Sequence, residues 1–223
     1  HDNQAQKGID FRPRFLWRMV LLMLFGLFDL LFYNGDILFL YAVCGVLIIP
    51  VIRASDKVIK ALIILMLLQP VELVYFIIGL INPDTQPLYL GSNSYFGDII
   101  AAQSAGTILD VAAAGIKNGL PVNFTWAIEN GRMTQTILFF LIGIMLGRKR
   151  LFYNEGDNLK TWKKVLAGSV IAFAVLLPLY LFVPKAIEIR CVSNSLNVAL
   201  NMWKNLAMML FIVSGVTLLY YNT

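Results

Sequence analysis

Long runs of apolar residues, separated by short polar segments, dominate the chain. Six of these runs are close to the roughly 17–25 apolar residues that a helix needs to cross the hydrocarbon core of a membrane. They cover about residues 15–33, 36–52, 58–81, 133–147, 165–183 and 196–221. The pattern therefore predicts an all-α fold, a polytopic transmembrane helix bundle of about six spans, with one membrane domain over residues 1–223.

The segment between the third and fourth runs, residues 82–132, is too long for a plain connection. Its first part contains several Pro and Gly residues, which favour turns. Its middle, residues 96–116, is rich in Ala and Ile and predicts one or two helices that lie at the outer membrane surface or re-enter it. Asn123 also opens an Asn-Phe-Thr sequon. The segment is either an ordinary helical lid or a loop that carries binding residues.

The composition agrees with a membrane protein. Hydrophobic residues make up 59% of the 223 residues and charged residues only 14%, against about 25% in a typical soluble domain. The mean hydropathy is +0.74. The net charge of +5 does not indicate nucleic-acid binding, because the basic residues stand in short clusters between apolar runs.

These basic clusters predict an orientation. Cytoplasmic loops of polytopic membrane proteins are enriched in Lys and Arg. The clusters precede the first run, surround the turn after the second and fill the loop after the fourth, so all of them fall on one side. We expect a plasma (inner) membrane protein whose N-terminal end is cytoplasmic. The residues are Arg12, Arg14, Arg18, Arg53, Lys57, Lys60, Arg148, Lys149, Arg150, Lys160, Lys163 and Lys164.

Metal and disulfide chemistry have no support in the sequence. The one histidine is His1, and the two cysteines, Cys44 and Cys191, have no spacing typical of a metal site or a disulfide framework. We expect no metal and no bound cofactor. The chain begins without Met or a signal-peptide pattern and ends close to an apolar run, so we interpret it as an internal piece of a longer protein, truncated at both ends.

Two aspartates stand near the turn between the first and second runs. Asp36 follows Gly35 and opens the second run, so its carboxylate is either an N-cap that accepts backbone N–H groups or a functional group. Asp29 lies inside the first predicted span, where water or a cation has to solvate or pair it.

A third acid, Glu72, lies about 13 Å below the outer end of the third run at 1.5 Å per residue. Gln69 and Pro70 precede it, and a proline inside a helix kinks it and frees a backbone carbonyl. The group either forms a polar cavity or makes a structural hydrogen bond to a residue such as Tyr41 or Tyr75. Acids inside a membrane are functional hypotheses by default.

Two ordered motifs resemble the YeiB-like membrane proteins, the family called domain of unknown function 418. The first is Gly-Leu-Phe-Asp at residues 26–29, followed by Gly-Asp-Ile-Leu at 35–38 and Tyr-Ala at 41–42. The second is Gly-Arg at 131–132 with Gln135, running into Phe-Leu-Ile-Gly-Ile-Met-Leu-Gly-Arg at 140–148. Three departures from the family pattern are Asp29, where the family usually has His, the missing N-terminal Leu-Asp-x-x-Arg-Gly helix, and the missing C-terminal segment that begins Gly-Arg-Met and continues into Thr-Asn-Tyr.

This family is distantly related to transmembrane acyltransferases, which move acyl groups from cytosolic acyl-CoA to an acceptor across the membrane. The resemblance implies acyl-CoA as a co-substrate, a lipid or glycan acceptor at the outer face, and the catalytic candidates Asp36, Asp29 and Glu72. The substrate-binding candidates are Gly35, Tyr41, Gln69, Arg132, Gln135 and Arg148. Arg148 is alternatively an anchor for its helix at the lipid headgroups.

Two other classes of function remain open. Intramembrane acids without an internal histidine or nucleophile also suit a proton-coupled small-molecule transporter. Polar residues that only lock helices together would indicate a structural membrane protein. The lipid bilayer is the one partner that all three hypotheses share, and nucleic acid is expected in none.

Overall fold

The computed structural model of the protein is built from α-helices and describes residues 12–33 and 35–222. His1 and Asn34 therefore lie outside the described residues. The chain packs as two compact units. Unit 1 contains the described residues up to Ala54 together with Tyr89–Ile137, and unit 2 contains Ser55–Leu88 and the described residues from Leu138 onward.

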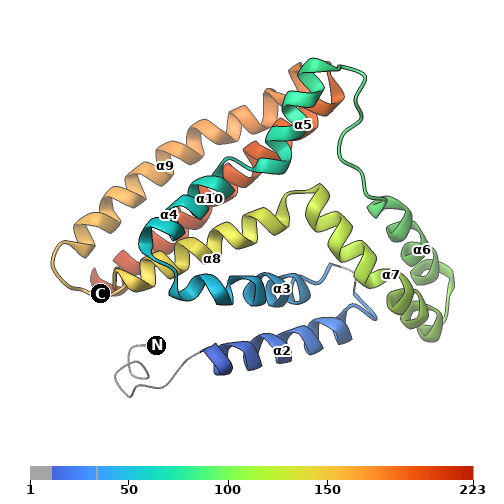
Figure 1. The fold of residues 1–223 in the computed structure, drawn as a ribbon, viewed down its shortest axis with the longest axis horizontal. Coiled ribbons are helices and arrows are strands. Elements are labelled where there is room, and N and C mark those ends of the chain that lie inside the picture. Colours follow the sequence, from blue (N-terminus) through green and yellow to red (C-terminus); the bar gives the residue numbers. More distant parts are fainter. Residues whose placement is uncertain (1–11, 34, 223) are drawn as a thin grey trace. The chain divides into compact units, whose positions relative to one another are not determined.

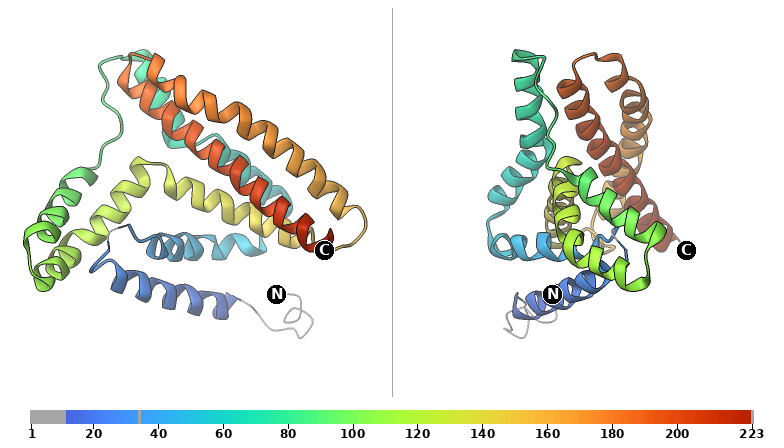
Figure 2. Two further views of the ribbon diagram at one scale, coloured as in Figure 1. Left: turned by 180° about the vertical axis from the view of Figure 1, so that it is seen from behind. Right: turned by 90° about the vertical axis from the view of Figure 1, so that its right-hand side faces the viewer.

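Unit 1 contains two pairs of packed helices, visible in Figure 2. Helix α2 (Arg12–Asp29) packs along α3 (Leu38–Ile48), which continues into the short 3-10 helix η1 (Ile49–Arg53). Helix α6 (Ser92–Ala105) packs along α7 (Ile108–Glu129). Residues 82–132 thus do form helices, as their composition predicts. Helix α8 (Arg132–Arg148) begins in unit 1 and ends in unit 2.

Glycines allow the closest approaches in unit 1. A Cβ on Gly26 of α2 would lie 2.6 Å from the backbone nitrogen of Phe39 in α3. A Cβ on Gly115 of α7 would lie 2.4 Å from the carbonyl oxygen of Leu31. Because both neighbours are backbone atoms that cannot turn aside, only glycine fits at these two crossings.

Unit 2 is built around the helix hairpin of α9 (Asn158–Phe182) and α10 (Arg190–Asn222), joined by the 3-10 helix η2 (Pro184–Ala186). Figure 1 shows α9 and α10 side by side; α5 (Pro70–Ile81) packs along α10, whereas α4 (Asp56–Leu67) contacts α10 through its last residue, Leu67. Hydrogen bonds join Leu67 to Trp203 and Tyr75 to Cys191, so the segment from the end of α4 through α5 runs antiparallel to α10 and therefore parallel to α9.

Within residues 12–33 and 35–222, three segments are long and apolar enough to cross a membrane, all of them in unit 2: Asp56–Ile81, Asn158–Ala186 and Arg190–Tyr221. They contain 26, 29 and 32 residues, and Leu38–Arg53 forms a shorter apolar helix. Many of their large apolar side chains remain exposed within the structure, such as Ile64, Ile171 and Phe211. Exposed apolar area of this extent on long helices is what contact with lipid requires.

Several predicted spans have different helix bounds in the structure; α9 and α10, for example, begin seven and six residues before the fifth and sixth predicted runs. The first was expected over residues 15–33, but α2 ends at Asp29. The amides of Phe32 and Tyr33 both donate to the Asp29 carbonyl, so residues 30–32 form a hydrogen-bonded turn after the helix. The third was expected as one kinked helix, but it is interrupted between α4 and α5.

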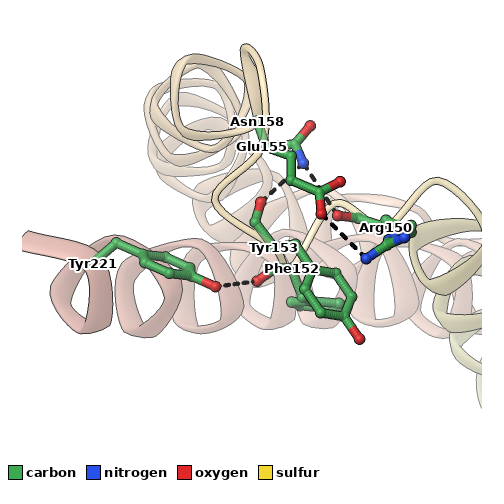
Figure 3. Close-up of polar contacts among 6 residues, drawn as sticks. All are labelled: Arg150, Phe152, Tyr153, Glu155, Asn158 and Tyr221. Atoms are coloured by element: carbon green, nitrogen blue, oxygen red, sulfur yellow. Dashed lines mark hydrogen bonds and ion pairs between the residues drawn. The ribbon is translucent and has the colours of Figure 1, made fainter. Parts of the chain in front are cut away.

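A network of polar contacts closes one end of unit 2, after α8 (Figure 3). Asn158 donates to the carbonyls of Arg150 and Tyr153, and Arg150 pairs with Glu155 at 3.1 Å. The hydroxyl of Tyr221, at the far end of α10, donates to the Phe152 carbonyl at 2.7 Å. These contacts hold the α8–α9 loop against the last turn of α10.

Candidate functional site

The interruption of the α4–α5 segment is the strongest local anomaly in unit 2. Gln69 has a left-handed backbone, with φ 49 and ψ 73, a conformation that costs energy for a residue with a side chain. Pro70 follows as the first residue of α5, and proline disfavours a helical conformation in the residue before it. The proline predicted a kink. The structure has a complete break near the middle of the 26-residue span.

Helix α10 stabilises the break by accepting and donating hydrogen bonds. The Gln69 side chain is buried, and its Nε2 donates to the Ala199 carbonyl at 3.0 Å. At the end of α4, the Leu67 carbonyl accepts a 2.9 Å hydrogen bond from the indole nitrogen of Trp203. The end of a helix leaves carbonyls without partners in the helix, so the indole takes over one of these contacts.

Glu72 lies in the first turn of α5, immediately after the break. Its side chain is only 7% exposed, and its Oε2 is a buried atom without a hydrogen-bond partner. The positive end of the α5 dipole favours a negative charge at this position. An unpaired buried carboxylate oxygen nevertheless costs free energy, because it has lost its contacts with water.

Gln69 Oε1 is also buried without a partner. Both unpaired atoms at the break are hydrogen-bond acceptors, and they belong to residues three apart in the chain. The chemistry that would satisfy them is therefore a donor: a proton on the carboxylate, a cation, or the N–H or O–H of a bound molecule. Gln69 and Glu72 together form the candidate site of unit 2.

The side chain of Asp36, in unit 1, accepts from the first two amides of α3 as an N-cap does, although Ile37 is the residue directly before the helix. Its Oδ1 accepts from the Leu38 amide at 2.9 Å and its Oδ2 from the Phe39 amide at 3.1 Å. Its own carbonyl accepts from Nδ2 of Asn123 at 2.7 Å. The carboxylate is 5% exposed and lies against the glycine position of α2, where a Cβ on Gly26 would stand 3.0 Å from Oδ2. Capping thus accounts for the burial of Asp36.

The role of Asn123 was not foreseen from the sequence, where it was noted only as the start of a sequon. Its side chain is buried at 6% exposure and binds the Asp36 carbonyl, so it is turned away from any glycan. Its Oδ1 is buried without a partner. The signal in the sequence was weak, because nothing in a single Asn indicates a partner 87 positions away.

The remaining candidates are distributed over both units. In unit 1, Asp29 is half-buried at the last residue of α2, Gly35 is exposed in the turn, and Tyr41 is 38% exposed on α3. The Arg132 guanidinium donates to Gln135 at 3.3 Å and lies 5.7 Å from the centre of the Trp126 ring.

Arg148 belongs to unit 2 and pairs with Asp56 at 2.6 Å, at the start of α4. Glu72 lies sixteen positions further along the same span, beyond the break that separates α4 from α5. The structure therefore groups Gly35 with Asp36, Arg132 with Gln135, and Gln69 with Glu72, and it separates Arg148 from Glu72. Among the described residues, no three His, Cys, Asp or Glu side chains gather in a way that could hold a metal ion.

No protein-family model matches the chain, and no curated protein or solved structure is significantly similar to it. The functional interpretation therefore depends on the geometry of the two units and on the motif residues themselves.

Proposed function

We propose that the protein is a six-span membrane transporter that binds a small molecule and couples this binding to a proton on Glu72. The observation that carries the proposal is the pair of buried, unpaired acceptors on Gln69 and Glu72 at a helix break near the middle of a span. Broken membrane helices commonly line the substrate and ion sites of transporters, at the depth of the bilayer centre.

The orientation that we propose follows from the charges of unit 2. At the end that contains the start of α4, the start of α9 and the end of α10, the basic residues are Lys57, Lys60, Arg148, Lys149, Arg150, Lys160, Lys163 and Lys164. The other end carries Lys185 and Arg190. The basic end is therefore cytoplasmic in a plasma membrane. The remaining spans of the proposed six are α2, α3 with η1, and α8.

Transport can be tested in cells that express the full chain. Uptake of a panel of radiolabelled small metabolites is compared with and without a protonophore. We expect one class of compound to be taken up only with an intact proton gradient, and this uptake to be lost in Glu72→Gln. The matched control is Glu188→Gln, which removes a carboxylate from the loop between η2 and α10 in the same unit. Gradient-dependent uptake that persists in Glu72→Gln would refute the role of this residue.

Acyl transfer is the second candidate, supported by the motif resemblance to YeiB-like proteins and through them to transmembrane acyltransferases. In this proposal the acceptor at the outer face is met by Asp36 and Asp29 of unit 1 or by Glu72 of unit 2, and acyl-CoA approaches the basic end. The test is labelling of lipid or glycan acceptors from radiolabelled acetyl-CoA in proteoliposomes. Asn also caps helices well, so Asp36→Asn removes the charge and keeps a cap. Unchanged labelling in this variant would exclude Asp36 as a catalytic residue.

A further inference from the structure

Helix α10 carries a row of polar side chains along a segment that is apolar enough to cross a membrane. Asn194, Asn197, Asn201 and Lys204 follow one another at three or four positions, and Asn205 lies four positions after Asn201. At 3.6 residues per turn they fall within an arc of about 100° on one side of the helix. We call these five residues the polar face of α10.

The polar face is not the side of α10 that packs on α5. Contacts to α4 and α5 come from Cys191, Ala199 and Trp203, which point to another side of the helix. Asn197 is exposed, while Asn194, Asn201 and Lys204 are half-buried. Within the part of unit 2 that the structure describes, no hydrogen bond is found for the side chains of Asn194, Asn197 and Asn201.

Three asparagine side chains without partners are incompatible with contact to lipid. Each amide group that enters hydrocarbon without a hydrogen bond costs several kcal/mol. The polar face therefore requires water or polar groups beside it over the half of α10 that begins at Arg190.

Lys204 gives this face its charge. It lies about 21 Å along α10 from Arg190 at 1.5 Å per residue, and its ammonium group stands 4.3 Å from the centre of the Tyr180 ring in α9. The ring face stabilises the charged form of the lysine. Cation and amide N–H groups on one face provide donors for a carboxylate or phosphate group.

We propose that the polar face of α10 lines an aqueous path from the outer end of unit 2 to Lys204, and that this path admits small soluble anions. The inference names the ligand class of the proposed transporter and in that sense rests on the proposed function. Protonation of Glu72 would accompany the entry of an anion, which is proton–anion symport. The path itself can be tested without any transport.

The test is thiol accessibility of the full chain in phosphatidylcholine proteoliposomes. Asn197→Cys and Asn201→Cys are labelled with an anionic reagent, sulfonatoethyl methanethiosulfonate, and with its cationic trimethylammonium counterpart. The native thiols of Cys44 and Cys191 are buried and give a low background. Val175→Cys, an exposed apolar position on α9, is the control that faces lipid.

We expect both asparagine positions to react and Val175→Cys to stay unlabelled. Each labelling rate is divided by the rate of the same reagent with a free thiol in solution. We expect this normalised rate to be higher for the anionic reagent. Adding Lys204→Gln should lower this anion preference roughly tenfold, and Lys204→Arg should retain it. Because Asn197 is exposed, its replacement keeps the test valid if Asn201→Cys fails to fold.

Several results would overturn the proposal. Absence of labelling at both asparagines means that protein or lipid covers the face. Labelling with no charge preference, or with a preference for the cation, excludes an anion path. Protection by inorganic phosphate is compared with protection by phosphatidylglycerol, to separate soluble anions from lipid anions. Slower labelling in the presence of inorganic phosphate supports the proposal. Slower labelling only when phosphatidylglycerol is added assigns the face to a lipid headgroup and refutes a soluble ligand. If the path is confirmed while Glu72→Gln retains gradient-dependent uptake, only the proposed coupling fails.

Discussion

Single residues decide the closest contacts in both units. Gly79 of α5 is buried where α5 meets α10, and a Cβ there would lie 3.0 Å from both Cys191 Cβ and Val192 Cγ2. A Cβ on Gly168 of α9 would have no neighbouring atom within 4 Å, so this glycine faces open space or lipid. Two glycines of the same unit thus have opposite tolerance for a side chain.

Gly79→Val is therefore expected to lower the free energy of unfolding by about 1–3 kcal/mol, the range for overpacked cores. Gly168→Val should leave stability almost unchanged. Thermal unfolding of both variants in detergent checks the pair. Equal stability of the two variants would contradict the close packing of α5 on α10.

Asp36 gives a second prediction about one residue. Asp36→Ala leaves the Leu38 and Phe39 amides without their acceptor and should destabilise unit 1 by about 1 kcal/mol. Asp36→Asn should lose much less, because an amide oxygen also accepts from these groups. Chemical unfolding of the two variants in parallel measures the difference. An equally large loss in Asp36→Asn and Asp36→Ala would show that the charge, rather than the cap, stabilises the fold.

At the scale of elements, helix α7 has the clearest start signal. Thr107 accepts from the Asp110 amide at 3.4 Å, and the Asp110 carboxylate accepts from the Thr107 amide at 2.7 Å and from its hydroxyl at 2.8 Å. This reciprocal pair is a capping box. The hydrogen bonds from the Thr107 amide and then from its hydroxyl lower the pKa of Asp110 below its ordinary value of 3.8.

The sign of the pH effect follows from this lowered pKa. The hydrogen bonds to the ionised Asp110 carboxylate contribute their full stability above the ordinary pKa of the carboxyl. This contribution is lost as the pH falls through the lowered pKa of the folded state. We expect the first turn of α7 to exchange its amide hydrogens faster in that acidic range. Thr107→Ala should raise the pKa of Asp110 towards 3.8 and cost about 1 kcal/mol of helix stability.

Titration of the Asp110 carboxyl by nuclear magnetic resonance, with hydrogen exchange of the α7 amides, checks this prediction. Ser104→Ala is the control, since the Ser104 hydroxyl is exposed and donates to a carbonyl within α6 without capping an amide. An unchanged pKa in Thr107→Ala would contradict the capping box.

At the scale of the whole molecule, the distribution of charge predicts the side of each loop. Asn154→Cys, in the exposed loop after α8, should react with a membrane-impermeant maleimide only in inside-out vesicles. Glu188→Cys, in the loop before α10, should react only from the opposite side. Labelling of both from one side would contradict a crossing by α9, and the reversed pattern would contradict the proposed orientation.

The sequence by itself determined the helical class, because long apolar runs in water-poor surroundings leave the backbone no alternative partners. Of its six predicted spans, three correspond to described segments that are long and apolar enough to cross a membrane. It also marked the interruption of the third run, since Pro70 cannot donate an N–H group and restricts Gln69. The sequence also identified Glu72 as an acid inside a span, because the apolar residues on both sides of it belong to one continuous stretch of the chain.

The tertiary structure alone decided what these residues contact. The bond from Gln69 to Ala199 and the bond from Asn123 to Asp36 join positions 130 and 87 residues apart, and no local pattern encodes such partners. The same holds for the choice between a cap and a free acid at Asp36. Local apolar periodicity fixes helices through backbone hydrogen bonding, whereas the satisfaction of a buried polar atom depends on which distant helix packs against it.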